Sequence, residues 1–137
     1  MIRIARYEDL IEILLIVKET IDTLQKQGNF QWSKDYPTKK HFEQDINNAH
    51  LYVYEIDNEV GGFICINNIE NKEYYGLPWR KKDKAIVIHR FAVKRKYQRQ
   101  KTGTKLMKFV ESYAFKKGIN YIKVDTNTKN IRMNALF

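Results

Sequence analysis

The chain has 137 residues, with 43% hydrophobic and 30% charged side chains and a formal net charge of +9 at pH 7. These values exclude a disordered or fibrous chain and fit a single globular domain spanning residues 1–137. The only cysteine, Cys65, excludes an intrachain disulfide, and its apolar neighbours indicate that it is buried. The positive charge is compatible with a nucleic acid, an anionic membrane surface or a polyanionic small ligand, because net charge informs about partners and not about fold.

The amino-terminal end has the features of neither a signal peptide nor a membrane span. Its apolar stretch, Leu10–Val17, is interrupted by Glu12 and falls short of the ~20 apolar residues that a span requires. We therefore expect a cytoplasmic protein without a membrane partner. The three histidines are scattered and give no metal-ligand spacing with the one cysteine, so we expect no metal.

The first part of the chain predicts one strand and two helices. Residues Ile2–Arg6 alternate in polarity as a strand does. Apolar residues then recur every three or four positions, which predicts an amphipathic helix over Leu10–Gly28. Thr38 is a suitable cap for a second helix, on which Phe42 and Ile46 share one face.

The middle of the chain predicts a series of strands. Residues 51–56 and 60–67 are rich in β-branched and aromatic side chains, and three polar residues separate them, so they are expected to form a hairpin. Residues 68–83 contain glycine, proline and many charges, which favours a loop. The apolar run Ala85–Val93 is the longest predicted strand.

The last part predicts a helix from about Gly103 to Lys117, a strand over Tyr121–Thr126 and a further helix from Asn130. The strands before and after the Gly103–Lys117 helix should be parallel, because a helical crossover joins them. The predicted fold class is therefore α/β, or α+β layered, with a mixed central sheet and helices on both faces.

One segment, Ile88–Met107, resembles the signature of the GNAT superfamily of N-acyltransferases. In that family a strand ending in an apolar-Ala-Val-like sequence leads into a loop of the form Gln/Arg-x-x-Gly-x-Gly/Ala, and a helix follows. Gln98 and Gly103 match the first and last positions of this loop, and Lys101 stands where the family usually has its middle glycine. The resemblance implies the acyl-CoA-binding fold, with acetyl-CoA as cosubstrate.

The physical chemistry of such a loop is independent of the resemblance. Amides that turn inward at a helix N-terminus form an anion site, and pyrophosphate is a natural occupant. The residues that the resemblance assigns to the cofactor are Phe91, Ala92, Val93, Gln98, Arg99, Gln100, Lys101, Thr102, Gly103, Thr104 and Asn130. The basic residues around the loop, which suit the phosphates of coenzyme A, are Arg95, Lys96, Arg99, Lys101 and Lys105. A solvated surface or a nucleic-acid patch is the alternative interpretation of these charges.

The resemblance extends beyond this segment. The pieces similar to one bacterial branch of the family are Gln31-Trp32, Tyr36-Pro37-Thr38 and Phe42-x-x-Asp45-Ile46, and Asp125-Thr126 with Asn130 resembles the element that meets the pantetheine arm. We expect Trp32 and the Asn68–Lys84 loop, which contains Tyr75, to border the acceptor pocket. Trp32 is also compatible with a core position, and Asn130 with a helix N-cap.

Acetyl transfer to an amine requires a deprotonated amine, a polarised carbonyl and a proton for the departing thiolate. His89 is the candidate base: it lies on the strand two residues before Phe91, hence on the same face, and its ordinary pKa suits proton transfer. A packed histidine is the alternative interpretation of His89. Glu55, Glu70 and Glu73, near the ends of predicted strands, are further candidate bases that the sequence does not rank. Many family members have a tyrosine where this chain has Phe137, so Tyr74, Tyr75 or water would have to supply the proton.

The predicted function is that of an N-acetyltransferase acting from acetyl-CoA on an amine of a small molecule or a protein. The alternatives are an acyl-CoA-binding module with little turnover and a basic nucleic-acid-binding domain. Only Tyr97 offers a stacking aromatic for the latter, so we expect no nucleic-acid partner. Family members normally continue with a pair of strands, so the domain is interpreted as truncated at its carboxyl end. The edge of Tyr121–Thr126 and the apolar residues of Asn130–Phe137 then predict a homodimer.

Overall fold

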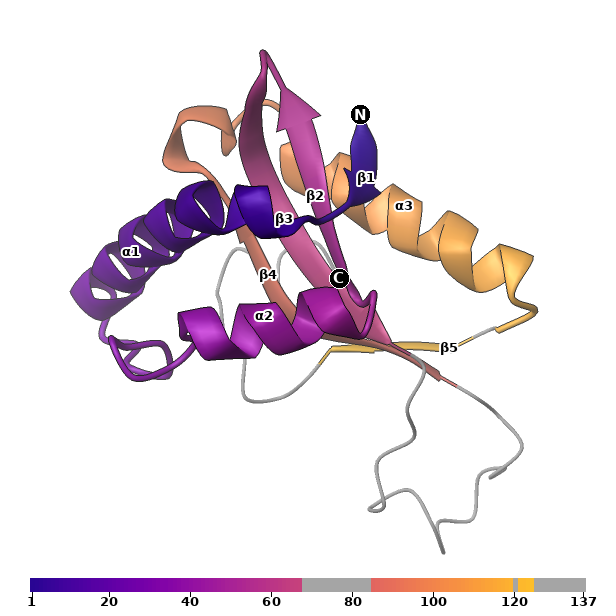
Figure 1. Cartoon of the computed structure of the whole chain (residues 1–137), viewed down its shortest axis with the longest axis horizontal. Coiled ribbons are helices and arrows are strands. Elements are labelled where there is room, and N and C mark those ends of the chain that lie inside the picture. Colours follow the sequence, from indigo (N-terminus) through magenta and orange to yellow (C-terminus); the bar gives the residue numbers. More distant parts are fainter. Residues whose placement is uncertain (68–84, 120, 125–137) are drawn as a thin grey trace, which may run out of the picture.

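The computed structural model describes residues 1–67, 85–119 and 121–124. A five-stranded sheet in the order β1-β2-β3-β4-β5 lies at its centre. Two helices, α1 and α2, cover one face of the sheet, and α3 covers the other (Figure 1). The predicted mixed sheet with helices on both faces is confirmed.

The amino-terminal elements follow the predicted order. Strand β1 spans Ile2–Ile4 and pairs with β2. It is two residues shorter than the predicted strand, which extended to Arg6. Helix α1 spans Leu10–Lys26 and ends ahead of Gly28, whose φ of 79° suits a glycine. Helix α2 spans Lys39–Asn47 and begins after the predicted cap residue Thr38.

The predicted hairpin is formed by β2, Leu51–Ile56, and β3, Glu59–Asn67. Asp57 and Asn58 occupy its turn with φ values of 51° and 63°, the left-handed conformation that tight hairpin turns require. Gly61 lies in β3 where the pairing register shifts. A Cβ at this position would lie 2.7 Å from Cγ2 of Ile56, so no larger residue fits without movement of its neighbours.

The carboxyl-terminal elements form the predicted crossover. Strand β4, Ala85–Val93, is antiparallel to β3 and parallel to β5, Tyr121–Val124. Helix α3 joins them; it spans Thr102–Lys116 and starts one residue before the predicted Gly103. The expected loop over residues 68–83, the end of the last strand and the helix from Asn130 lie outside the described residues.

The sheet separates two hydrophobic cores. The core under α1 and α2 contains Leu10, Ile13, Val17, Leu24, Trp32, Phe42, Leu51, Val53, Phe63 and Cys65, and the core under α3 contains Ile64, Ile66, Ile86, Ile88, Phe91, Leu106 and Val110. The predicted burial of Cys65 is confirmed, and removal from water raises the pKa of its thiol to about 12.

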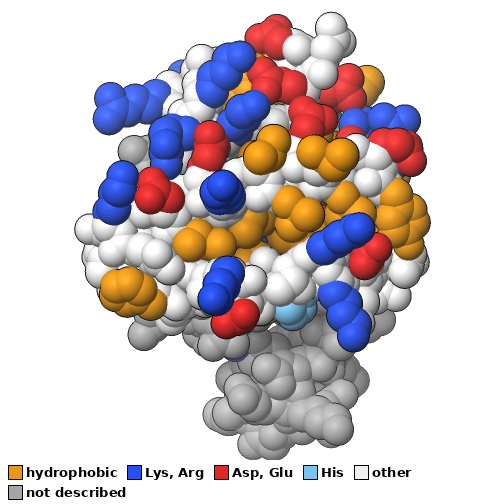
Figure 2. Space-filling model, turned by 60° about the vertical axis from the view of Figure 1, so that its left-hand side comes forward, with side chains coloured by type: hydrophobic (Ala, Val, Ile, Leu, Met, Phe, Trp, Pro, Cys, Tyr) orange, Lys and Arg blue, Asp and Glu red, His pale blue; other side chains and the backbone are white. Residues whose placement is uncertain are grey.

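The outer face of α1 is partly apolar. Ile11 and Leu15 on this helix are 75% and 57% exposed. Figure 2, which brings the α1 side of the molecule forward, shows hydrophobic side chains in a band between charged ones.

Candidate functional site

The end of β4 leads through a short turn into the loop before α3. A 3-10 helix, Arg95–Tyr97, follows the strand, and Gln98 begins the loop. The Nε2 group of Gln98 donates a hydrogen bond to the carbonyl of Val93 at 3.1 Å. This bond fixes the start of the loop against the last residue of β4.

Consecutive backbone amides remain without partners where the loop becomes helix. Within the described residues, no hydrogen bond is made by the amides of residues 101–104, and no side chain caps the helix. The Lys105 amide is the first to bond, to the carbonyl of Lys101 at 2.9 Å. Free amides at the positive end of a helix form an anion site, so this arrangement fits a pyrophosphate.

Lys101 adopts a left-handed backbone conformation, which a glycine would adopt without strain. Its φ and ψ are 63° and 18°, in the left-handed region, and it is the N-cap of α3. The lysine at this position keeps the left-handed turn before α3. It also leaves an exposed ammonium group beside the amides.

The five basic side chains predicted to surround the loop have different partners. Arg95 bonds to α1 through the carbonyl of Glu19, Oγ1 of Thr23 and the carboxylate of Asp22. Lys96 bonds to Glu59 and Lys105 to the hydroxyl of Tyr54. Among the described residues, only Arg99 and Lys101 of the five have no side-chain partner, so these two are the cations most available to a phosphate.

A carboxylate from the β2–β3 hairpin anchors the turn that precedes the loop. Glu59 accepts hydrogen bonds from Nζ of Lys94 at 2.5 Å, from the hydroxyl of Tyr97 at 2.5 Å and from Nζ of Lys96 at 3.0 Å. The bonds from Lys94, Tyr97 and Lys96, in that order, lower the pKa of Glu59 to about 2. This anchor, which no local sequence pattern indicates, connects the hairpin to the candidate cofactor loop.

Strand β4 has two halves with different neighbours. Residues 85–88 pair with β5, and the described part of β5 ends at Val124, opposite Ile88. Phe91, Ala92 and Val93 pair with β3 on one side only among the described residues. The predicted pantetheine-binding segment thus offers backbone groups along an edge that leads to the amides of residues 101–104.

His89 lies where the pairing of β3 with β4 shifts. Cys65 pairs with Arg90 and Ile66 with Ile88, so His89 is an extra residue in β4. This irregularity interrupts the alternation of the strand, and the spacing to Phe91 no longer defines the face of His89. Nε2 of His89 lies 3.0 Å from Oδ1 of Asn67, which orients the ring. Its role as a base stays a prediction.

Trp32 belongs to the core under α1 and α2. It is 1% exposed, and its Nε1 group has no hydrogen-bond partner among the described residues. Any effect of this ring on an acceptor would therefore act through the segment that carries it, residues 27–38, which connects α1 and α2.

A buried polar cluster on the face of the sheet covered by α1 and α2 was not predicted as part of the site. Arg90 of β4 donates to both carboxylate oxygens of Asp45 in α2, at 2.7 and 2.5 Å. It also donates to the hydroxyl of Tyr36 at 3.1 Å, and its Nη2 lies 3.7 Å from Sγ of Cys65. Burial lowers the pKa of Arg90, but the bonds to Asp45 and the nearby charges outweigh it and raise the pKa. Asp45 and Tyr36 appeared in the sequence only within the resemblance, and nothing local linked them to Arg90.

Several predicted site residues lie outside the described part of the chain. These are Tyr75, Asn130, Tyr74 and Phe137. Within the described residues, no three metal-ligating side chains come together, and no helix has the length and apolar character to cross a membrane.

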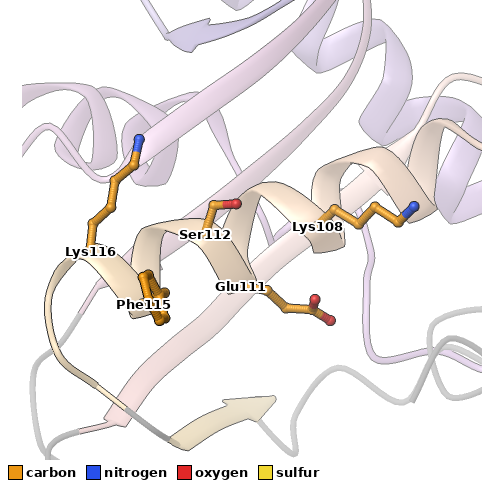
Figure 3. Close-up of a pocket in the computed structure, with 5 residues that line it drawn as sticks. All are labelled: Lys108, Glu111, Ser112, Phe115 and Lys116. Atoms are coloured by element: carbon orange, nitrogen blue, oxygen red, sulfur yellow. The ribbon is translucent and has the colours of Figure 1, made fainter.

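A pocket on α3 does not include the predicted site residues. It has a volume of about 450 Å³ and is lined by Lys108, Glu111, Ser112, Phe115 and Lys116. Figure 3 shows that all five side chains come from the one helix and none from the sheet. We therefore do not include it in the candidate site.

Comparison with known proteins identifies the family. The profile of the Acetyltransferase (GNAT) family matches residues 17–137. A structure from Staphylococcus aureus Mu50 described as an acetyltransferase is 25% identical, with a TM-score of 0.74, and the match covers 98% of this chain and 89% of that one. A GNAT-family acetyltransferase from Streptococcus agalactiae 2603 is 21% identical, with a TM-score of 0.77 and coverage of 99% and 80%. An aminoglycoside acetyltransferase from an uncultured soil metagenomic sample, in complex with sisomicin, is 19% identical, with a TM-score of 0.63 and coverage of 99% and 82%. No curated protein matches the chain. Because the family profile covers most of the sequence, the chain belongs to the GNAT family of acetyltransferases.

Proposed function

We propose that this protein is an N-acetyltransferase that binds acetyl-CoA along the Phe91–Val93 segment of β4 and transfers the acetyl group to an amine of a small molecule or a protein. The observation that carries the proposal is the row of amides of residues 101–104, which have no hydrogen-bond partner in the described part of the chain and which follow the Phe91–Val93 segment of β4. The amides would hold the pyrophosphate, and that segment would hold the pantetheine arm. Arg99 and Lys101 add positive charge beside the phosphates.

The chemistry assigned to the chain is positioning and proton transfer. Acetyl-CoA supplies an activated acetyl group when it is bound. Backbone amides near Phe91–Val93 would orient and polarise the acetyl oxygen. His89 would accept a proton from the amine, directly or through water. Tyr74, Tyr75 or water would return a proton on the thiolate side, because Phe137 carries no acidic hydrogen.

The test of the cofactor site is the variant Gly103→Val, measured by calorimetry with acetyl-CoA. A branched side chain at the second residue of α3 would block the approach of the phosphates, so we expect affinity at least tenfold weaker than in the parent. Ser112→Val is the control, because it places the same side chain at an exposed position of the same helix. Equal affinity of Gly103→Val and the parent would show that the assignment of the loop is wrong.

A second candidate function is an acyl-CoA-binding module with little turnover. Phe137, at the position where many family members have a tyrosine, favours it. Release of free thiol from acetyl-CoA over a panel of amines distinguishes the two candidates. Binding without thiol release would support the module, and amine-dependent release would support the transferase.

A further inference from the structure

The cluster of Arg90, Asp45 and Tyr36, called here the Arg90 cluster, joins three separate parts of the chain. Arg90 lies in β4, Asp45 in α2 and Tyr36 in the connection between α1 and α2. The side chains of Arg90 and Asp45 are only 13% and 8% exposed. The cluster therefore fixes the α1–α2 connection to β4 at one defined point.

Stability alone does not account for such a pair. Desolvation of two charges consumes much of their mutual attraction, and apolar residues of similar size often replace buried ion pairs without loss of stability. An arginine fixes the relative positions of its partners, because its planar guanidinium can donate to both carboxylate oxygens and to a third group at once. Here the third group is the hydroxyl of Tyr36. The arrangement is suited to hold that hydroxyl in one place.

The Arg90 cluster would lie near the acetyl end of a cofactor bound in the proposed site, and this inference rests on that site. The amides of residues 101–104 lie beyond the carboxyl end of β4, and Phe91–Val93 are the last three residues of that strand. A cofactor held by both would have its acetyl end near the preceding residues, His89 and Arg90. The loop begins α3, so the cofactor would approach from the α3 side of the sheet.

The acceptor amine must then approach the acetyl group from the face of the sheet opposite α3. Arg90 faces α2 on the opposite side of the sheet, and the α1–α2 connection borders that side. The half-buried Tyr36 is therefore placed beside the path that an acceptor would take.

We infer that Tyr36 contacts the acceptor amine substrate and that Arg90, held by Asp45, is the positioning residue for its hydroxyl. Arg90 donates to the Tyr36 oxygen, so the phenolic hydrogen points elsewhere, and no described residue accepts it. The charges of Arg90 and Asp45 compensate each other, so the site offers a neutral donor and an aromatic ring. It fits an amine that carries a hydrogen-bond acceptor, such as a hydroxyl group, next to the amino group.

The test compares trans-2-aminocyclohexanol with cyclohexylamine in the thiol-release assay. The two amines differ by one hydroxyl group. We expect the parent to prefer the amino alcohol, and Tyr36→Phe to reduce this preference about threefold to tenfold, which is the effect of one neutral hydrogen bond. The affinity for acetyl-CoA, from calorimetry, should stay within twofold. Tyr7→Phe is the matched control, because the hydroxyl of Tyr7 bonds to Asn47 at the end of α2 and not to the cluster.

The positioning role is tested by Arg90→Lys, which keeps the charge opposite Asp45 but not the fork of donors. It should reduce the same preference in the parent and have little further effect in the Tyr36→Phe background, because both changes remove one interaction. Thermal unfolding of each variant identifies any that fails to fold, and Tyr36→Phe retains the ring in any case.

Three results would overturn the inference: no preference for the amino alcohol in the parent, an unchanged preference in Tyr36→Phe, or a loss of acetyl-CoA affinity as large as the loss of preference. In these cases amine-dependent turnover by the parent would leave the proposed function standing. A parent that binds acetyl-CoA but acetylates no amine would overturn the inference together with the proposed turnover.

Discussion

Lys101 illustrates how a single residue departs from a family pattern while its backbone keeps the required shape. Left-handed conformations cost a non-glycine residue about 1 kcal/mol, and no side-chain hydrogen bond of Lys101 to another described residue offsets that cost. The ammonium group is exposed beside the free amides of the helix start. Strain and charge are thus placed together at the proposed phosphate site.

The variant Lys101→Gly separates these two effects. Relief of the left-handed strain should raise the melting temperature by roughly 3 °C, and loss of the charge should weaken acetyl-CoA binding and reduce its dependence on salt. Lys108→Gly is the control, since this exposed lysine lies inside α3, where glycine costs about 1 kcal/mol. Loss of stability in both variants would contradict the strain that we assign to Lys101.

At the scale of elements, the proposed cofactor loop depends on two neighbours that hold the preceding turn. Arg95 is fixed by α1, and Lys94, Lys96 and Tyr97 are fixed by Glu59 at the end of the hairpin. The ring of Tyr97 is buried and lies against Gly61, where a Cβ would be only 3.0 Å from Cδ2. The turn is therefore packed as well as hydrogen-bonded.

We expect Glu59→Gln to weaken acetyl-CoA binding about threefold to tenfold, because the turn loses charge-assisted hydrogen bonds. A purely electrostatic effect has the opposite sign, since the change removes a negative charge near the cofactor, so the direction of the change in affinity is decisive. Glu55→Gln is the control, because Glu55 bonds to Arg3 on the far side of the hairpin. Affinity that is unchanged or tighter in Glu59→Gln would contradict the anchoring role.

The pH dependence of this anchor follows from the lowered pKa of Glu59. A carboxyl group whose pKa is lower in the folded state stabilises that state above its unfolded pKa, near 4, and the stabilisation is lost as the pH falls toward 2. Glu59→Gln should therefore show a smaller loss of stability than the parent over this acidic range.

At the scale of the whole molecule, the sheet supports two cores, and β5 is the last strand in its order. Tyr121 in β5 is 48% exposed. The predicted homodimer around β5 and the following residues stays a prediction. The apolar outer face of α1, with Ile11 and Leu15, offers a different surface for association.

Light scattering at micromolar concentration checks the assembly. We expect the parent to associate and Ile122→Lys to shift it toward the monomer, since a charge in β5 would be buried in the interface. Leu15→Lys tests the α1 face in the same way. A monomeric parent, or dissociation by Leu15→Lys alone, would show that β5 does not form the interface.

The sequence by itself determined the order of the helices and strands in the described residues, and it predicted the position of the proposed cofactor loop. These depend on local signals: apolar spacing in α1, the turn residues Asp57 and Asn58, and a glycine after each of the helices α1 and α3. Such signals act between residues close in sequence, so they are visible without the fold. The resemblance added the family, which the comparison confirmed.

Only the tertiary structure decided the partners of the charged residues. The bond from Arg90 to Asp45 spans 45 positions in the sequence, and the bond from Lys94 to Glu59 spans 35. The sequence therefore did not show which lysines and arginines near the loop have a carboxylate partner. The shift in pairing at His89 likewise depends on the register of β3 against β4. Hydrogen bonds of this kind form between groups that packing brings together, and packing is a property of the assembled layers rather than of any one segment.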